Sequence, residues 1–350
     1  MNEVKSRIPS GASPPPKILY IGGTGRTGST VLGKLLGQFD GVFSAGELAF
    51  LWEYGLTRGG RCSCGARLAS CEVWSSVLNA AFGAEPPDPQ RMTELRRRFW
   101  SGHLPLMLLP GGGRRGLRRL EEFPQVVEKV YRALGSVTGA RVVIDSSKEP
   151  HYSYILREAT NLQVYFLHLV RDPRAVGYSW RHRPLEQTVD GAVLSRQRGP
   201  LRVSLYYAVS NAAAEAVWAR HPRSRLLRYE DFVARPRDTL LAISEFLGEP
   251  LPVDDVLEGT RFRVRSLHSA WENSNRFQRG MVDLALDDSW RSGLAGSTRL
   301  QLEALTWPFM LRYGYRFRRH HPRGAARTLH SRINRGALAA KGDGPSGDAQ

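Results

Sequence analysis

A glycine-rich turn between an apolar strand and an apolar helix constrains the fold of this chain most. Residues 17–21 read KILYI, a predicted strand, and residues 29–38 carry the apolar periodicity of a helix. Between them, residues 23–28 begin and end with Gly, the spacing of a phosphate-binding loop of the form G-x-x-x-x-G-x-[ST]. Ser29 stands where nucleotide triphosphatases have Lys, so the cation of this loop is Arg26. Glycine-rich turns also occur without ligands, but strand, loop and helix together predict backbone amides that hold one phosphate.

A second strand-to-helix junction also carries phosphate-binding side chains. Residues 167–180 read LHLVRDPRAVGYSW, an apolar strand followed by a helix whose first position suits Pro173. Arg171 ends the strand, Ser179 follows eight residues later and Arg183 twelve residues later. Because a helix N-terminus already favours negative charge, these side chains could together hold one anionic group. The alternative is a solvated basic helix face, which this segment alone does not exclude.

Strand and helix candidates alternate along the chain, which predicts an α/β fold with a doubly wound parallel sheet flanked by helices. Ligands of such sheets bind at the carboxyl ends of the strands. Four charged residues each follow a predicted strand, so we expect them to converge on one crevice: Arg26, Asp145, Lys148 and Arg171. The predicted strands are 18–22, 142–145, 164–170 and 225–229, and the predicted helices are 29–38, 126–135, 151–159, 174–181, 204–220, 238–247 and 298–313.

Together the two junctions resemble the sulfotransferases that use 3′-phosphoadenylyl sulfate (PAPS). In that family a loop of the form [KR]-[ST]-G-[ST]-T follows the first strand, and here residues 26–30 read RTGST. A later junction supplies an Arg and a Ser, eight residues apart, for the 3′-phosphate of the donor, and Arg171 and Ser179 match this pattern. The similarity is greatest to the tyrosylprotein and bacterial small-molecule branches. These place a glutamate base in a Gly-Glu pair, which is Gly46 and Glu47 here.

The resemblance implies a P-loop NTPase-like sulfotransferase architecture and transfer of a sulfuryl group from PAPS to a hydroxyl. Glu47 would be the general base, with Arg26 and Lys148 as electrostatic stabilisers of the transferring group. Neither residue need be catalytic: Glu47 could instead stabilise the start of a helix through its negative charge, and Lys148 could be a surface residue after a strand. No metal is required by this scheme. The residues implied to bind the donor are Gly25, Arg26, Thr27, Gly28, Ser29 and Thr30 at the 5′-phosphate, Arg171, Ser179 and Arg183 at the 3′-phosphate, Tyr229 beside the nucleotide, and Arg276 or Arg279 as late phosphate clamps.

Two other functions remain open. An apolar strand that ends in Asp145 is also typical of the Mg²⁺ ligand of a P-loop kinase or NTPase that uses Mg-ATP. Ser29 in place of the expected Lys is the observation against that class. A non-catalytic anion-binding protein would show the same two phosphate motifs. The PAPS-dependent enzyme is the favoured hypothesis because it accounts for both motifs at once.

The charge balance favours anionic ligands without choosing among them. The chain has 50 Lys and Arg against 33 Asp and Glu, a formal net charge of +17, which steers anions of many kinds. Much of the excess lies in segments predicted to be peripheral, at residues 96–100, at 111–120 and from 316 onward. Because the sequence has no zinc-finger spacing, RNP-like aromatic signature or basic heptad array, we expect no dedicated nucleic-acid binding.

The sequence predicts one sulfotransferase-like domain at residues 17–317, with a variable helical insertion at about 83–125 that the family resemblance does not match. Residues 1–16 are polar and Pro-rich, and residues 318–350 mix Gly, Ala and Arg, so both segments are predicted to be disordered. No apolar run reaches membrane-spanning length and no secretory h-region is present, which favours a cytoplasmic enzyme. The expected acceptor is a small-molecule or carbohydrate hydroxyl, and the oligomeric state is left open.

All three cysteines lie close together in the sequence, as Cys62, Cys64 and Cys71. A similar Cys-rich patch followed by Trp, here Trp74, follows the Gly-Glu pair in bacterial members of the family that the chain resembles. With no His nearby in the sequence, three sulfur ligands make a weak prediction of zinc. We expect a packed loop here, with metal binding or a disulfide as the alternatives.

Overall fold

The computed structural model describes residues 14–107, 117, 120–182, 186–187, 193–195, 198–265, 267–272 and 274–317. The chain divides into two units, Met1–Tyr315 and Arg316–Gln350, and the elements below belong to the first. Most of residues 1–16 and all of 318–350, which the sequence predicts to be disordered, lie outside the described residues. Within the predicted helical insertion, the structure has helix α3, Pro89–Met107.

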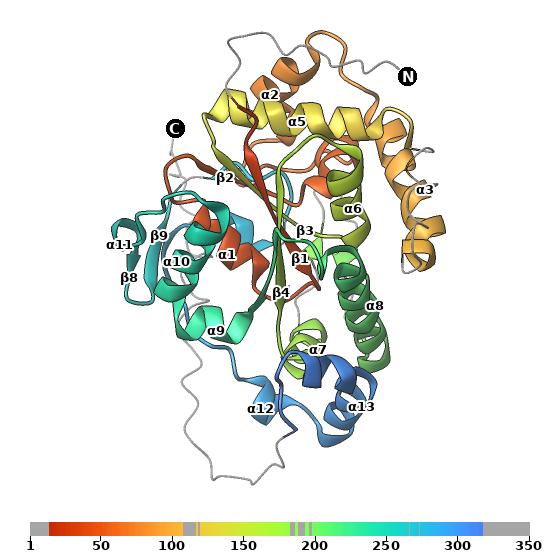
Figure 1. Ribbon diagram of the computed structural model, residues 1–350, viewed down its shortest axis with the longest axis vertical. Coiled ribbons are helices and arrows are strands. Elements are labelled where there is room, and N and C mark those ends of the chain that lie inside the picture. The colour runs from red at the N-terminus through yellow and green to blue at the C-terminus, as the bar shows by residue number, and fades with distance from the viewer. Residues whose placement is uncertain are drawn as a thin grey trace, which may run out of the picture. The chain divides into compact units, whose positions relative to one another are not determined.

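A five-stranded parallel sheet forms the centre of the first unit, with helices on both faces (Figure 1). Its strands are β1 (Lys17–Gly23), β2 (Val42–Gly46), β3 (Val142–Lys148), β4 (Val164–Val170) and β7 (Ser224–Arg228). They lie in the order β2, β3, β1, β4, β7. In the sheet, β2 and β3 lie on one side of the central strand β1, and β4 and β7, which follow later in the chain, lie on its other side. The prediction of a doubly wound parallel sheet is confirmed.

Helices connect the strands, and every predicted helix is present. Their bounds are α1 Ser29–Leu36, α2 Glu72–Phe82, α5 Phe123–Thr138, α6 Pro150–Ala159, α7 Pro173–Arg181, α8 Pro200–Trp218, α9 Tyr229–Ala234, α10 Pro236–Leu247, α11 Val253–Val256, α12 Trp290–Gly293 and α13 Gly296–Arg312. Proline occupies the first turn of α5, α6, α7, α8 and α10, where its missing N–H leaves no helical hydrogen bond unmade. Asp172 caps α7 by accepting a hydrogen bond of 2.9 Å from the Arg174 amide.

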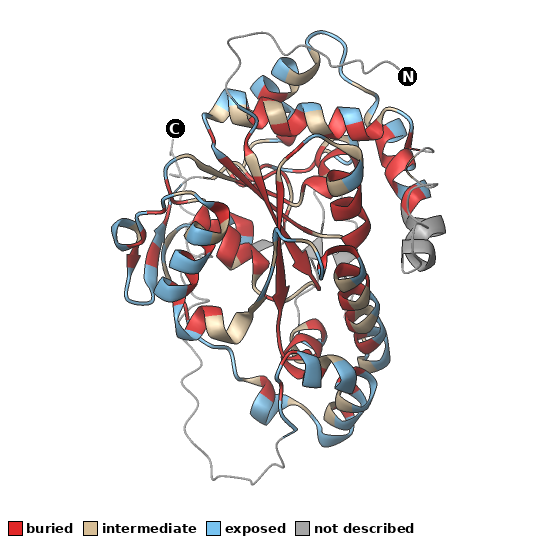
Figure 2. Cartoon of the chain, viewed as in Figure 1, coloured by how far each residue is buried: buried red, intermediate tan, exposed pale blue. Residues whose placement is uncertain are grey.

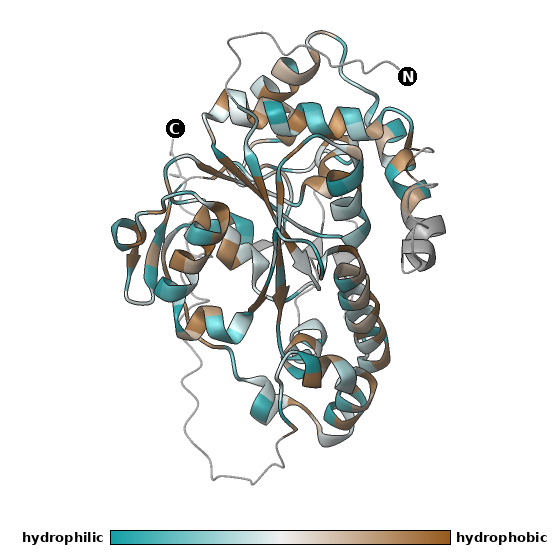
Figure 3. Cartoon of the chain, viewed as in Figure 1, coloured by the Kyte–Doolittle hydropathy of each residue, from teal (hydrophilic) through white to brown (hydrophobic). Residues whose placement is uncertain are grey.

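Side-chain alternation along the strands explains why both faces of the sheet are covered. In β1, Ile18 and Tyr20 point to one face and Leu19 and Ile21 to the other, and all are fully buried. One face packs against α2, α5, α6 and α8, and the other against α1 and α10. Figure 2 shows the buried residues concentrated in the strands and on the inner sides of these helices, and Figure 3 shows hydrophobic strands at the same place. Such apolar strands are what a parallel sheet covered on both faces requires.

The structure contains one central strand that the sequence analysis did not predict. β2 reads VFSAG and is short, so its hydropathy does not distinguish it from a loop. Gly46 at its end has a φ of 80°, and a Cβ there would lie 2.6 Å from the Trp271 carbonyl oxygen. Only Gly therefore fits this position, and Glu47 follows it directly at the edge of the sheet.

Smaller elements complete the described structure. A three-stranded antiparallel sheet contains β8 (Leu257–Glu258), β9 (Arg261–Val264) and β10 (Gly280–Asp283), and a two-stranded sheet pairs β5 (Glu186–Gln187) with β6 (Val193–Ser195). Among the described residues, no helix is both long enough and apolar enough to cross a membrane.

Candidate active site

A cavity of about 990 Å³ lies where the carboxyl ends of the central strands meet. A lining residue follows or ends each strand: Arg26 for β1, Glu47 for β2, Lys148 for β3, Arg171 for β4 and Tyr229 for β7. Doubly wound sheets bind their ligands at this position. The structure thus brings the predicted loop and the two predicted strand-end cations into one cavity. Other predicted residues that line it are Gly25, Gly28, Ser29, Thr30 and Ser179.

The loop after β1 is shaped to present backbone amides to a ligand. Arg26 and Gly28 have left-handed φ values of 74° and 89°, and turns of this kind point successive N–H groups to one side. Gly28 precedes α1 without a side-chain cap, and the first N–H groups of a helix have no acceptor within it. A Cβ at position 28 would lie 2.5 Å from the Tyr229 ring, so space as well as φ requires Gly there. These amides are suited to an anionic group.

Arg171 and Ser179 contact the loop directly. Arg26 Nε donates to Ser179 Oγ at 2.9 Å, and Arg171 Nη1 donates to the Arg26 carbonyl oxygen at 3.2 Å. The Arg171 guanidinium also packs over Tyr229, 4.5 Å from the ring centroid. Its Nη2 lies 3.3 Å from an Asp287 carboxylate oxygen, whereas its buried Nε has no hydrogen-bond partner among the described residues. A buried guanidinium N–H without a partner is a donor that an anionic ligand would satisfy.

Glu47 and Lys148 form an ion pair inside the cavity. Glu47 Oε1 and Lys148 Nζ are 2.5 Å apart, and both side chains are largely buried. Lys148 also donates to the Ser146 carbonyl oxygen at 2.5 Å, and its φ of 65° is uncommon for a residue other than Gly. The Glu47 amide donates to the Trp271 carbonyl oxygen at 2.7 Å, which holds the backbone after β2. A carboxylate and an ammonium group are therefore fixed side by side at the end of the sheet.

Two further carboxyl groups line the cavity, and the sequence analysis did not single them out. Burial raises the pKa of Glu149 to about 8 and that of Glu272 to about 7, and the nearby Glu47 carboxylate acts in the same direction. Glu149 Oε2 lies 3.2 Å from His151 Nε2, and burial holds the pKa of His151 well below its usual range. Ser146 Oγ donates to Glu272 at 3.1 Å. Both carboxyls therefore hold a proton for much of the time near neutral pH.

Protonation of these two carboxyls should contribute stability that is lost as the pH rises toward 8. Their pKa values in the folded protein, about 8 for Glu149 and about 7 for Glu272, lie above the ordinary value of 4.5. Between those limits these two carboxyls bind more protons in the folded protein than in the unfolded chain, so their contribution to the unfolding free energy falls with rising pH. Glu149→Gln is expected to make the urea midpoint depend less on pH between about pH 5 and pH 8.

Glu245→Gln is the matched control, since Glu245 is exposed on α10, and it should keep the wild-type pH dependence. If the urea midpoint of Glu149→Gln depended on pH as strongly as that of the wild type, burial would not be shifting the titration of Glu149.

Asp145, the candidate Mg²⁺ ligand of the kinase alternative, is fully buried and does not line the cavity. Its carboxylate accepts hydrogen bonds from Tyr131 Oη, from Ser147 Oγ and, at 2.8 Å, from the Ser147 amide. Burial raises its pKa to about 6. Because both carboxylate oxygens are engaged within the protein, Asp145 supports the end of β3 and has no oxygen directed at a ligand.

Some residues predicted to bind the donor do not line the cavity. Thr27 is fully buried in the loop, and Arg276 is buried between two aromatic rings. Arg279 donates to the Ser63 carbonyl oxygen at 2.8 Å. None of these three described residues is part of the cavity wall, so their contact with a donor stays a prediction. Arg183 lies outside the described residues, and its role also stays a prediction.

Aromatic rings that the sequence analysis did not select form much of the remaining wall. Tyr206 Oη accepts a hydrogen bond of 3.1 Å from the Gly25 amide, and its ring meets that of Trp180 edge to face. Tyr54 and Trp271 form a stacked pair with ring centroids 4.9 Å apart. Rings of this kind offer apolar surfaces to a planar or apolar ligand group.

Several solved structures resemble this chain, among them bacterial sulfotransferases and a retinol dehydratase. The sulfotransferase domain of the olefin synthase from Synechococcus PCC 7002 is 19% identical, with a TM-score of 0.44, over 87% of this chain and 98% of that one. The sulfotransferase domain from the curacin biosynthetic pathway is 19% identical, with a TM-score of 0.45, over 84% and 99%. A retinol dehydratase, in complex with androsterone and the inactive cofactor PAP, is 15% identical, with a TM-score of 0.34, over 85% and 82%.

Sulfotransferases are thus among the proteins of known structure that this chain resembles, as its motifs predict. No protein-family model matches the sequence, and no curated protein matches it.

Proposed function

We propose that this protein is a sulfotransferase that moves the sulfuryl group of PAPS to a hydroxyl of a small-molecule or carbohydrate acceptor. The observation that carries the proposal is the contact between the two predicted phosphate sites. Arg26 donates to Ser179 at 2.9 Å, and Arg171 donates to the Arg26 carbonyl oxygen at 3.2 Å. Two adjoining anion sites suit a donor that carries a 3′- and a 5′-phosphate on one ribose.

The residues present fit these two phosphate groups. We assign the 5′-phosphate to the amides and hydroxyls of Ser29 and Thr30 at the start of α1. We assign the 3′-phosphate to Arg171 and Ser179, because Arg171 keeps a buried Nε donor without a partner among the described residues. An anionic oxygen already contacts this guanidinium, since the Asp287 carboxylate lies 3.3 Å from Nη2, and a phosphate would replace it.

The roles of the charged residues follow from the transfer reaction. The donor supplies a sulfuryl group, which becomes bonded to the acceptor oxygen as its bond to the 5′-phosphate oxygen breaks. Glu47 accepts the proton that leaves the acceptor hydroxyl. Lys148 and Arg26 stabilise the negative charge that develops on the 5′-phosphate side. The 2.5 Å contact between Glu47 and Lys148 keeps base and cation in one place.

The surroundings of Glu47 support a small acceptor. The Phe50 amide donates to the Glu47 carbonyl oxygen at 3.1 Å, and the Glu47 amide donates to the Trp271 carbonyl oxygen at 2.7 Å, so the backbones of two aromatic wall residues are joined to that of the proposed base. Phe50, Tyr54 and Trp271 all line the cavity. We place the acceptor against these rings, with its hydroxyl toward Glu47.

The kinase alternative predicts a dependence on Mg²⁺ that the sulfotransferase does not. Arg26, Lys148 and the loop amides provide the positive field that a kinase obtains from Mg²⁺. Transfer is therefore expected to continue at the full rate in buffer stripped of Mg²⁺, measured as adenosine 3′,5′-bisphosphate released from PAPS. No release from PAPS, together with Mg²⁺-dependent turnover of ATP by the same protein, would favour the kinase and return Asp145 as a candidate ligand.

The direct test uses PAPS that carries a labelled sulfuryl group. The full chain is incubated with this donor and with a panel of alcohols, phenols and sugars, and labelled product is compared with released adenosine 3′,5′-bisphosphate. Equal amounts of the two are expected with at least one acceptor class. Binding of the donor without transfer to any acceptor would favour the non-catalytic anion-binding protein.

The expected cytoplasmic location remains a prediction.

A further inference from the structure

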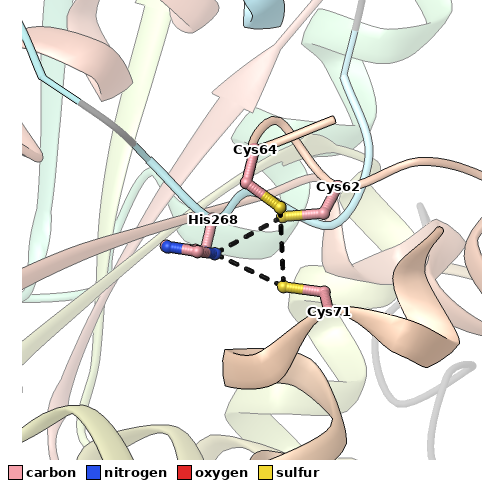
Figure 4. A group of neighbouring side chains, drawn as sticks. All are labelled: Cys62, Cys64, Cys71 and His268. Atoms are coloured by element: carbon pink, nitrogen blue, oxygen red, sulfur yellow. Dashed lines mark hydrogen bonds between the residues drawn. The ribbon is translucent and has the colours of Figure 1, made fainter. Parts of the chain in front are cut away.

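Four side chains of the types that bind metals meet in a cluster separate from the cavity wall. Three are the cysteines of the turn and helix start at residues 61–72, Cys62, Cys64 and Cys71, and the fourth is His268 from the segment after β9 (Figure 4). The ligand atoms of all four lie within 4.8 Å of one another. The cysteines are free thiols, and Cys62 and Cys71 are buried. None of the four lines the cavity, so the proposed sulfuryl transfer leaves them without a role.

Three separations between these atoms are close to the edges of a tetrahedral zinc site. Zinc–sulfur bonds of about 2.3 Å and zinc–nitrogen bonds of about 2.0 Å place two sulfurs about 3.8 Å apart, and a sulfur about 3.5 Å from a nitrogen. Here the Sγ atoms of Cys64 and Cys71 are 3.8 Å apart. His268 Nδ1 lies 3.3 Å from Cys71 Sγ and 3.8 Å from Cys62 Sγ. Figure 4 shows the sulfur atoms and Nδ1 facing one another.

The surrounding backbone holds the side chains in this arrangement. The Gly65 amide donates to the Cys62 carbonyl oxygen at 2.9 Å, closing a tight turn in which Gly65 has a φ of 101°. Trp74 Nε1 donates to the His268 carbonyl oxygen at 2.7 Å. Ser63 Oγ donates at 2.6 Å to the carbonyl oxygen of the residue before His268. The backbone around His268 is thus hydrogen-bonded to the Cys-containing segment through Trp74 and Ser63.

We propose that Cys62, Cys64, Cys71 and His268 bind one structural Zn²⁺ ion. Thiolate sulfur and imidazole nitrogen are ligands that zinc prefers, and four protein ligands leave no open position for a substrate. Binding would release the three thiol protons and form three zinc–sulfur bonds, so the centre would carry one negative charge. Arg279, which donates to the Ser63 carbonyl oxygen at 2.8 Å, places a cation beside it.

The ion would hold one wall of the active-site cavity in place. The segment that carries His268 continues to Trp271 and Glu272, which both line the cavity. This segment also runs beside the end of β2, where the Ala270 amide donates to Ala45 at 2.8 Å and Gly46 bridges in parallel to Trp271. Zinc would therefore link the Cys-containing turn to the wall next to Glu47, and the sulfuryl transfer itself would not pass through the metal.

Metal analysis of the full chain tests this proposal independently of any enzymatic activity. The protein is expressed with added zinc, purified with a metal-free reductant, and its metals are measured by plasma mass spectrometry. One equivalent of zinc per chain is expected, together with three thiols that become titratable only after unfolding in a chelator. Zinc near zero under these conditions would overturn the proposal. So would a Cys64–Cys71 disulfide found by peptide mapping of the protein purified without reductant.

Replacement of zinc by cobalt tests the ligand set. The wild-type protein is expected to show the intense visible absorption and sulfur-to-cobalt charge transfer of a tetrahedral thiolate site. Cys71→Ser should weaken both bands because it removes one cobalt–sulfur bond, and His268→Ala should change the visible absorption. His221→Ala, a His after α8 and outside the cluster, should leave both bands as in wild type. A weak, octahedral-type cobalt spectrum of the wild-type protein would contradict the assignment even if the variants failed to fold.

Discussion

Replacing Glu47 by Gln is expected to slow turnover by roughly a hundredfold to ten-thousandfold, the range typical of a lost general base. Glutamine keeps the shape of the side chain but cannot accept the acceptor's proton. The affinity for adenosine 3′,5′-bisphosphate should stay near the wild-type value, because we assign Glu47 to the acceptor and not to the donor phosphates. Steady-state turnover with an alkyl alcohol and calorimetric titration of the bisphosphate measure the two quantities on one preparation. An alkyl alcohol is preferred because a phenol, with its lower pKa, needs a base less.

Matched carboxyl variants separate the base from its neighbours. Glu245→Gln, on the exposed side of α10, should turn over at the wild-type rate. Glu272→Gln and Glu149→Gln change the other carboxyls of the cavity. If Glu272→Gln lowered turnover more than Glu47→Gln did, the base would have to be reassigned to Glu272. A Glu47→Gln protein that lost thermal stability but kept its turnover per folded molecule would show that Glu47 only orders the loop.

Arg171→Ala is expected to weaken binding of adenosine 3′,5′-bisphosphate by roughly tenfold to a hundredfold, the equivalent of one or two charge-assisted hydrogen bonds. Binding of adenosine 5′-phosphate, which lacks the 3′-phosphate, should change much less. The reason is that we assign the Arg171 guanidinium, with its unpartnered buried Nε among the described residues, to the 3′-phosphate. Calorimetric titration of each nucleotide into the wild-type protein and into Arg171→Ala measures how much affinity each nucleotide loses.

Ser179→Ala should produce a smaller loss of the same selectivity, since Ser179 Oγ is a neutral group bonded to Arg26. Arg237→Ala is the arginine control, because Arg237 pairs with Asp254 on the exposed surface and does not line the cavity. Equal weakening of the two nucleotides by Arg171→Ala would remove Arg171 from the 3′-phosphate site. In that case its packing over Tyr229 would be its main contribution to the structure.

Much of the fold could be predicted because its signals are local. The strand, loop and helix around Gly28, and the strand and helix around Arg171, each combine an apolar run with a helix start that proline or glycine marks. The parallel arrangement then follows from the alternation of strands and helices. β2 could not be predicted, since VFSAG is short and its partner β3 lies about a hundred residues further along the chain.

The rest of the site depends on contacts between distant segments. His268 lies beside the three cysteines, and Glu272 lies near Glu47. Both are brought there by the bridge between Gly46 and Trp271, which are more than two hundred residues apart in the sequence. No local sequence pattern indicates such a contact. The raised pKa of Glu149 arises from burial, which the sequence around Lys148 does not reveal. Arg276 and Arg279 are predicted as phosphate clamps from the family resemblance of their loop, and in the structure their guanidinium groups donate to backbone carbonyl oxygens.

Thermal unfolding in the presence of two nucleotides tests the proposed function most directly. A ligand at a hundred times its Kd stabilises a folded protein by about 2.7 kcal/mol, so specific binding gives a clear rise in Tm. We predict that adenosine 3′,5′-bisphosphate raises the Tm of the full chain in buffer without Mg²⁺, and that Mg-ATP at the same concentration raises it much less. A rise with Mg-ATP and none with adenosine 3′,5′-bisphosphate would contradict the assignment of this cavity to a PAPS-dependent sulfotransferase.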